Sequence, residues 1–343
     1  MPLVCIDAAE AYSHLKSNRE AFWPARSKDP TRLEPYCQPK FKPSFKLAPA
    51  EQVFTIGSCF ARNIERHLRR LGYKTPTNEY VPQELIGLPL DGFMNKFTPH
   101  SMLNEVRWAL APEDAPDPAL ALVPKRDGSF LDAQLMSKIA VSHERGRERR
   151  QEITSVFQRI RDCRITVITL GLVEAWYDKK AELYLNRSVP KETADLEPGR
   201  FELHVLDYNE LYSSTRQLIE LILLRGHADG RIILTVSPVP LTATFTDNDV
   251  VSANMYSKSV LRAVAEHIVR EFDAVDYFPS YESVMLSERE LTWLDDLVHV
   301  RDEIISLNVA RMAVAYAPSP ASAEIALRLM PPHVLAQLSD SLL

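Results

Sequence analysis

The sequence predicts an α/β protein with a mostly parallel β-sheet that is covered by helices on both faces. Short apolar runs of strand length occur at residues 53–56, 165–170 and 232–236. Longer segments with apolar residues at helical spacing lie between and after them, as at residues 208–224 and 253–272. This alternation is typical of βαβ units, in which parallel strands are joined by helical crossovers.

The N-terminal segment, residues 1–50, lacks this pattern. Prolines recur between Pro24 and Pro49 with aromatic residues among them, and no period is sustained. We therefore expect an irregular arm that packs over the main domain. The main domain is expected at residues 51–317, and residues 318–343 are expected to form a C-terminal helical extension.

In the first half of the main domain, a helix is expected at residues 62–71 and another at 100–110, where Pro99 suits a helix start. Residues 112–134 are rich in proline and aspartate and predict a surface loop. A charged helix follows at residues 143–161. Its arginines alternate with glutamates, which indicates a solvated face and not a phosphate clamp; they are Arg145, Arg147, Arg149 and Arg150.

The second half repeats the strand and helix unit. The apolar run that Gly171 ends predicts a central strand buried on both faces. Residues 178–200 are expected to be an irregular insertion before the next helix. The remaining expected elements are a short strand at 274–278 and helices at 302–316 and 321–342, the last interrupted by Pro331 and Pro332.

Composition and charge exclude several classes of protein. The chain has 343 residues and a formal net charge of −6, so it has no overall basic field for nucleic acid or an anionic membrane. Its four cysteines show no paired spacing, which favours reduced thiols in the cytoplasm. The N-terminus lacks a secretion-signal pattern, and no apolar run approaches the roughly 20 residues that span a bilayer. We expect a cytoplasmic protein with no membrane span.

The junction between the strand at 53–56 and the helix that follows it carries the strongest chemical signal. Its residues are Gly57-Ser58-Cys59-Phe60-Ala61. A side chain in the first turn of such a helix lies at the carboxyl edge of the sheet, where unpaired backbone N–H groups favour negative charge. We therefore expect Cys59 to be a nucleophile with a lowered thiol pKa. The alternative is that Cys59 is a small buried hydrophobic residue.

A thiol nucleophile needs a base and a group that orients this base. Asp296 and His299 have the spacing Asp-x-x-His after the last predicted strand. The carboxylate can fold back onto the imidazole and fix its tautomer. The sequence contains no Walker loop, no G-x-G-x-x-G motif and no histidine pair with zinc spacing. We expect no metal and no tightly bound cofactor.

The junction resembles the signature of the GSCFA family, which is related to the SGNH (GDSL-like) hydrolases. The resemblance extends over roughly residues 50–300 in ordered blocks, which include 97–100, 169–176, 236–241, 254–258 and 277–282. It implies a flavodoxin-like three-layer α/β/α sandwich with a hydrolase-type site at the carboxyl ends of the strands. The main domain would then be the catalytic domain.

The resemblance also implies roles for single residues. Laying Gly57-Ser58-Cys59 over the Gly-Asp-Ser block of SGNH enzymes makes Cys59 the nucleophile, with Ser58 as the alternative. Gly171 would contribute to the oxyanion site. Glu174 stands near the place of an asparagine donor, so it is expected to orient substrate or transfer a proton. Further candidates for the cleft, with local capping or core packing as the alternative, are Trp176, Ser237, Asn254 and Lys258.

These observations predict an acyl-transfer enzyme, an esterase or acyltransferase, in which Cys59 attacks an ester or thioester. By analogy with the superfamily, the substrate is an O-acyl group of a glycan, with acyl-coenzyme A as a candidate donor. A non-catalytic module that binds a glycan or a partner on a hydrolase scaffold is the alternative. A third interpretation is a redox-sensing thiol that Cys37 or Cys163 approaches in the fold.

Overall fold

The computed structural model describes residues 2–27, 32–87, 92–328 and 332–336. Its centre is a four-stranded parallel sheet in the order β1 (Val53–Gly57), β4 (Ile165–Leu170), β8 (Arg231–Val236) and β9 (Val275–Tyr277). All three strand pairings are parallel. The mostly parallel sheet that the sequence predicts is therefore confirmed.

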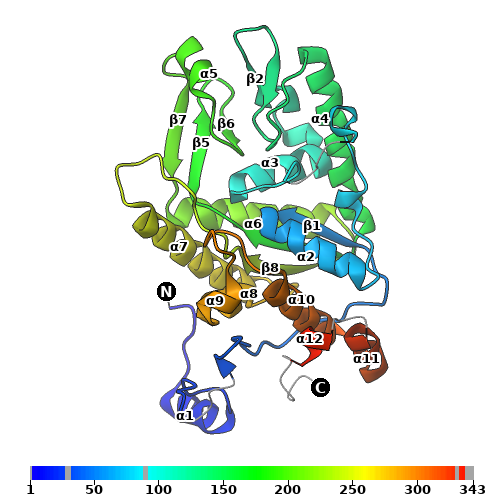
Figure 1. The fold of residues 1–343 in the computed structure, drawn as a ribbon, viewed down its shortest axis with the longest axis vertical. Coiled ribbons are helices and arrows are strands. Elements are labelled where there is room, and N and C mark those ends of the chain that lie inside the picture. The colour runs from blue at the N-terminus through cyan, green and yellow to red at the C-terminus, as the bar shows by residue number, and fades with distance from the viewer. Residues whose placement is uncertain (1, 28–31, 88–91, 329–331, 337–343) are drawn as a thin grey trace.

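Helices cover both faces of this sheet and make a three-layer α/β/α sandwich (Figure 1). Val53, Val167 and Ile233 share one core with α2 (Cys59–Arg70) and α10 (Asp302–Tyr316). Ile56, Ile168 and Leu234 belong to a second core on the opposite face, because successive strand residues alternate between faces. The helices of that second core are α3 (Pro99–Leu110), α4 (His143–Gln158), α6 (Tyr208–Arg225) and α7 (Val250–Glu271).

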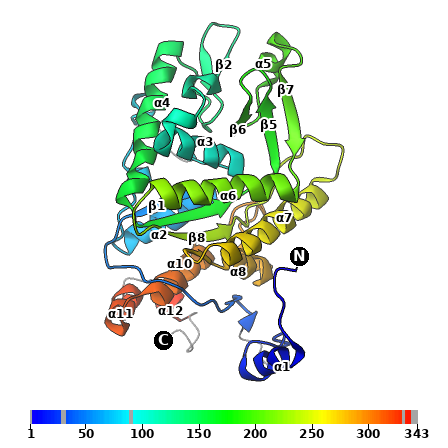
Figure 2. The same ribbon diagram turned by 180° about the vertical axis from the view of Figure 1, so that it is seen from behind.

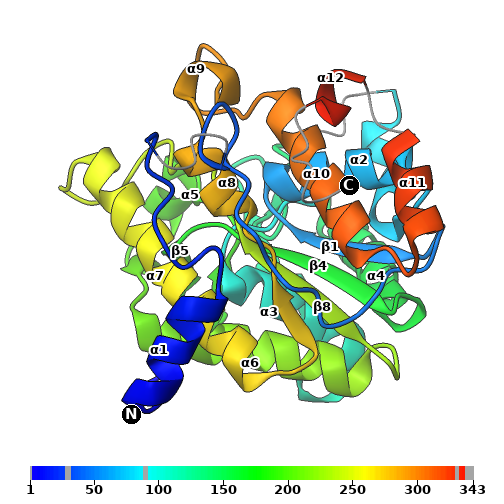
Figure 3. The same cartoon turned by 90° about the horizontal axis from the view of Figure 1, so that it is seen from below.

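Shorter helices complete the sandwich at its lower end, seen from below in Figure 3. They are α8 (Ser280–Leu286), α9 (Arg289–Thr292), α11 (Pro320–Arg328) and α12 (Pro332–Leu335). The helix expected at residues 321–342 is thus described as two pieces, and residues 329–331 and 337–343 lie outside the described part. Within the described residues, no helix combines the length and apolarity that crossing a membrane requires.

The N-terminal arm is only partly as expected. Residues 8–17 form a helix, α1 (Ala8–Ser17), that the sequence analysis did not predict; Asp7 caps its first turn, and all of its side chains are exposed or half-buried. Further along, Tyr36, Phe45 and Leu47 are buried. The Phe45 ring lies 4.9 Å from that of Tyr316 on α10. This second part of the arm packs over the sandwich.

Two segments predicted to be loops contain strands instead. Residues 112–134 hold the antiparallel pair β2 (Leu122–Pro124) and β3 (Phe130–Asp132). The predicted insertion at 178–200 belongs to an antiparallel sheet of β5 (Glu174–Asp178), β6 (Leu183–Leu185) and β7 (Phe201–Val205), with α5 (Lys191–Leu196) between β6 and β7. These strands lie above the parallel sheet, as the reverse view in Figure 2 also shows. The loop predictions are wrong because strands of three to five residues carry little periodicity, and only their packing in a separate apolar cluster stabilises them.

The prediction that the arginines of α4 lie on a solvated face is also wrong for two of them. Arg149 and Arg150 are 1% and 2% exposed. Arg150 Nη1 donates to Glu105 Oε1 on α3 at 2.9 Å, and its Nε lies 2.8 Å from Asp132 on β3. Glu105 also pairs with the buried Lys96 at 2.6 Å. The carboxylates that hold Arg150 in the core come from distant segments, so the helix pattern alone does not reveal this burial.

We expect Gly57→Ala to destabilise the fold by about 2–4 kcal/mol, because a methyl group there has no space. Gly57 has φ of +153°, and a Cβ would lie 1.7 Å from Thr169 Oγ1 on the adjacent β4. Urea unfolding measures the loss. Gly128→Ala is the matched control, since Gly128 has φ of +79° but open space around a Cβ; strain alone should cost it about 1 kcal/mol. Equal losses in the two variants would show that the contact with Thr169 does not matter.

Candidate active site

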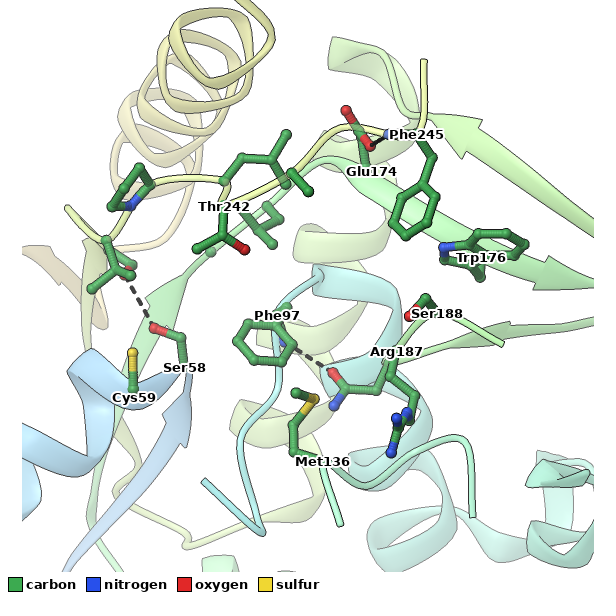
Figure 4. A pocket seen from close by; sticks show the side chains of 18 of the residues that line it. Ser58, Cys59, Phe97, Met136, Glu174, Trp176, Arg187, Ser188, Thr242 and Phe245 are labelled. Carbon is green, nitrogen blue, oxygen red and sulfur yellow. Dashed lines mark hydrogen bonds between the residues drawn. The ribbon is translucent and has the colours of Figure 1, made fainter. Parts of the chain in front are cut away.

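A pocket of about 430 Å³ opens at the carboxyl edge of the parallel sheet (Figure 4). The ends of β1, β4 and β8 supply Ser58, Gly171 and Ser237 to its lining. The antiparallel sheet, the segment after β8, the link from β4 to β5 and the residue two before α3 supply its outer walls. These walls are largely apolar: Phe97, Leu172, Trp176, Leu185, Val239 and Phe245. The pocket is therefore concave and mostly apolar with a few polar groups, as small-molecule sites are.

Ser58 joins β1 to α2 and is held by the scaffold. Its hydroxyl caps α2 by accepting the N–H of Phe60 at 3.3 Å. The same oxygen lies 3.1 Å from Ser237 Oγ, the hydrogen bond drawn from Ser58 in Figure 4. Ser58 is 3% exposed. The structure thus places Ser58 and Ser237 together at the floor of the pocket.

Cys59 is the first residue of α2, and its free thiol lines the pocket beside Ser58. Burial raises the pKa of this thiol. The N–H of Phe60, the Ser58 hydroxyl and the charge of Lys258 act in the opposite direction, but by less. The predicted lowering of the Cys59 pKa is therefore wrong: the helix N-terminus is in place, and the loss of water outweighs it.

Lys258, on α7, lies near Cys59, but it is not among the residues that line the pocket, so its predicted place in the cleft is wrong. Its side chain is 2% exposed, and its Nζ donates to the backbone oxygen of Gly171 at 2.7 Å. Burial lowers the pKa of Lys258 to about 7, while the nearby Cys59 thiolate would raise it. Cys59 and Lys258 are therefore close enough for the charge of each to change the ionisation of the other.

Asp296 and His299 form the predicted pair. His299 Nδ1 lies 2.6 Å from Asp296 Oδ2, and the backbone N–H groups of Val298 and His299 both donate to Asp296 Oδ1 at 2.9 Å. The hydrogen bond with His299 and these two N–H groups hold the Asp296 pKa at about 2. The side chain of His299 is 59% exposed.

His299 lines the same pocket as Cys59, so the fold brings together the proposed nucleophile and base. Among the described residues, no hydrogen bond joins the Cys59 thiol to the His299 ring. The hydrogen bond between Asp296 and His299 is therefore formed, whereas the one between His299 and Cys59 is not.

Gly171 and Glu174 follow β4 at the pocket wall. A Cβ on Gly171 would lie 2.6 Å from the oxygen of Phe97, so only glycine fits this approach. Glu174 Oε1 accepts from Thr244 Oγ1 at 2.5 Å, and its Oε2 accepts from the N–H of Phe245 at 3.2 Å. Glu174 thus ties the loop after β8 to the antiparallel sheet.

Trp176 and Asn254 also support this loop. The Trp176 ring meets that of Phe245 edge to face, with centroids 5.2 Å apart. Asn254 on α7 accepts the N–H of Leu241 at 3.0 Å and is not among the residues that line the pocket. Of the predicted cleft residues, Trp176 therefore lines the pocket, and Asn254 fixes the segment that forms one of its walls.

Comparison with protein families decides the relationship that the signature indicated. The model of the GSCFA family matches residues 52–311. The chain belongs to the GSCFA family. Comparisons with curated proteins and with solved structures gave no match. The matched range contains every residue of this GSCFA pocket, including Cys59 and His299.

Sequence reasoning missed four polar residues in the lining of the pocket: Asn186, Arg187, Ser188 and Thr242. The first two follow β6 directly. Asn186 is buried, donates to the oxygen of Asn95 at 2.7 Å and accepts the N–H of Phe97 at 2.9 Å. The only signal was a polar pair after the apolar Leu183 and Leu185, inside a segment predicted to be irregular. Within the described ranges, no three His, Cys, Asp or Glu side chains gather as metal ligands would.

We expect alkylation of Cys59 by iodoacetamide to titrate above the usual thiol pKa of about 8.5, because the thiolate reacts and burial disfavours it. Lys258→Met should raise this pKa further and slow the reaction at pH 8.5 by about 3- to 10-fold, since a positive charge near the thiolate is lost. Peptide mass spectrometry follows Cys59, with the exposed Cys5 as internal standard.

The control for this titration is Lys191→Met, which removes an exposed lysine on α5. It should leave the Cys59 profile unchanged. A midpoint at or below 8.5 in the wild type, or equal profiles in the two lysine variants, would contradict the balance of burial and charge described for this thiol.

Proposed function

We propose that this GSCFA protein is an acyl-transfer enzyme, an esterase or acyltransferase, that uses Cys59 as its nucleophile. One observation carries the proposal: Cys59, on the first turn of α2, and His299, which is hydrogen-bonded to Asp296, line one pocket at the carboxyl edge of the sheet. A nucleophile, a base and an orienting carboxylate are the three groups that covalent acyl transfer needs.

In the proposed reaction, Cys59 Sγ attacks the carbonyl carbon of an ester or thioester. The thiol proton passes to His299 Nε2, because Nδ1 donates its hydrogen to Asp296. The bond from the acyl carbon to the leaving oxygen or sulfur then breaks, and His299 returns the proton to that atom. In the second half, water or an acceptor hydroxyl attacks the acyl-cysteine and gives its proton to His299. The bond from the acyl carbon to Cys59 Sγ then breaks, and His299 returns the proton to the sulfur.

The raised pKa of Cys59 supports a mechanism in which the base acts during the attack. A protonated thiol is a weak nucleophile at neutral pH and has to lose its proton as the new bond forms. His299 has to come within hydrogen-bond reach of the thiol for this step, and such catalytic hydrogen bonds often tighten only when substrate binds. The exposed position of His299 leaves space for that movement.

The contacts favour Cys59 over Ser58 as nucleophile. The Ser58 hydroxyl caps α2 and lies 3.1 Å from Ser237, whereas the Cys59 thiol caps no helix and lines the pocket, with the Ser58 hydroxyl and the N–H of Phe60 beside it. The resemblance to SGNH hydrolases directs the search for substrates to O-acyl groups of glycans. It also makes acyl-coenzyme A the donor to test first, in a cytoplasmic setting.

A non-catalytic binding module is the second candidate. The observation in its favour is that the thiol pKa is raised while the Cys59–His299 hydrogen bond is open. This candidate predicts that no acyl donor leaves an acyl group on Cys59, although the pocket binds ligands.

We expect acyl thioesters and p-nitrophenyl esters to acylate Cys59, which mass spectrometry detects as an added acyl mass. Cys59→Ala should abolish turnover, and His299→Ala should lower kcat by about 10²- to 10⁴-fold because the general base is lost. Ser58→Ala should keep the acyl group on Cys59, at a cost of about 1 kcal/mol in stability for the lost helix cap.

Cys5→Ala is the matched control for Cys59→Ala, because Cys5 is exposed and far from the pocket in sequence. It should retain full turnover. Full turnover by Cys59→Ala would remove the proposed mechanism and direct attention to Ser58.

A further inference from the structure

We propose that Arg187 makes this pocket selective for substrates that carry an oxyanion, a carboxylate or a phosphoryl group, on the part of the molecule bound away from Cys59. The inference rests on the proposed function in that it concerns the same pocket. It goes further because it assigns the chemical class of the substrate.

Arg187 lies directly after β6 and contributes to the pocket lining. Figure 4 shows Cys59 and Arg187 on different sides of the pocket, with Phe97 and Met136 between them. Among the described residues, the guanidinium makes one hydrogen bond, from Nη1 to the oxygen of Ser137 at 2.8 Å. That contact fixes the side chain, and a ligand in the pocket would meet the guanidinium at Nη2, because Nε is itself buried.

The Nε–H of Arg187 is buried and has no acceptor in the described part of the chain. Nη2 likewise makes no hydrogen bond there. Two other arginines show what this edge ordinarily binds. Arg164 donates from Nε and Nη2 to Glu51 at 2.6 and 2.9 Å. Arg200 donates to Asp178 from the same two nitrogens. Such an edge binds a planar oxyanion through two hydrogen bonds, and in Arg187 the second of them requires the lining over Nε to move when the ligand binds.

The acidic side chains that line or adjoin the pocket are already engaged elsewhere. Glu174 accepts from Thr244 and Phe245, and Asp296 pairs with His299. No described carboxylate forms an ion pair with Arg187, and burial alone lowers the pKa of its guanidinium. An oxyanion from a ligand would offset this burial cost with charge-assisted hydrogen bonds.

Beyond Ser58, the part of the pocket between Cys59 and Arg187 is largely apolar, because the side chains of Phe97 and Met136 lie there (Figure 4). A group that fits there is a short aliphatic chain or ring edge, with its reactive carbonyl at one end and its charge at the other. The pocket volume of about 430 Å³ lies within the range of small-molecule sites and accommodates an acyl or sugar fragment.

The test measures how ligands protect Cys59 from iodoacetamide at constant ionic strength, and needs no turnover. The probes are hexanoate, hexyl phosphate and the neutral hexanamide, three six-carbon ligands with different head groups. At least one anion should protect Cys59 at a concentration about 10- to 100-fold below that of hexanamide. Protection by hexanoate alone assigns a carboxylate, by hexyl phosphate alone a phosphoryl group, and by both a general oxyanion site.

The variant is Arg187→Gln, which keeps a polar side chain and removes the charge. It should lose the preference for the anions, whereas protection by hexanamide should stay within about threefold of the wild type. Arg126→Gln is the matched control, because Arg126 is an exposed arginine between β2 and β3. It should behave as the wild type does.

The outcomes separate the two proposals. If Cys59 is alkylated normally and the anions protect no better than hexanamide, the role of Arg187 is overturned and the acyl-transfer proposal stands. If Cys59 neither reacts with iodoacetamide nor accepts an acyl group, the acyl-transfer proposal fails. Isothermal titration calorimetry of the same probes then decides on Arg187: an anion preference that Arg187→Gln abolishes supports the inference, and its absence overturns it.

Discussion

The close approach of β1 to β4 at Gly57 is the constraint on which the site depends. A side chain at this position would overlap Thr169, and only its absence lets the chain leave the sheet and begin α2 two residues later. The backbone oxygen of Gly57 accepts the N–H of Lys96 at 2.8 Å. Because the Lys96 ammonium is itself fixed by Glu105, the buried ion cluster of α3 and α4 holds the turn that presents Cys59.

The pocket that shelters the thiol also opposes its ionisation. Burial raises the pKa of Cys59 and lowers that of Lys258 to about 7. Near neutral pH, the pair of thiolate and ammonium is therefore not favoured over the pair of neutral thiol and neutral amine. A stable thiolate is therefore not the resting form that this environment favours. An exposed imidazole such as His299, oriented by Asp296, can exchange protons with water and so serves the proposed reaction better than a sealed base.

What could be predicted from the sequence followed the strength of its periodic signals. The parallel strands and the helix after Pro99 are visible as apolar patterns along the sequence, and Asp296 and His299 are three residues apart, so these features were predictable. The antiparallel sheet was not, because its strands are short and depend on one another. The predicted direction of the Cys59 pKa shift was wrong for a similar reason. A helix N-terminus is visible in the sequence, whereas the burial comes from distant segments that meet only in the fold. The resemblance supplied roles that spacing alone could not.

The insertions around a common sheet edge explain how such a pocket acquires selectivity. Both carboxylate oxygens of Glu174 accept hydrogen bonds from the loop, one from Thr244 and one from Phe245. The Glu174 side chain therefore acts as an acceptor and does not donate a hydrogen bond to an oxyanion. The N–H groups of Phe60, Ala61 and Arg62 already bind Ser58, so the backbone N–H of Cys59 is the donor that the first turn of α2 offers to an oxyanion. This donor belongs to the sandwich, while the wall that carries Arg187 belongs to the insertion. Changes in the insertion can therefore alter which acyl group enters without disturbing the chemistry at Cys59.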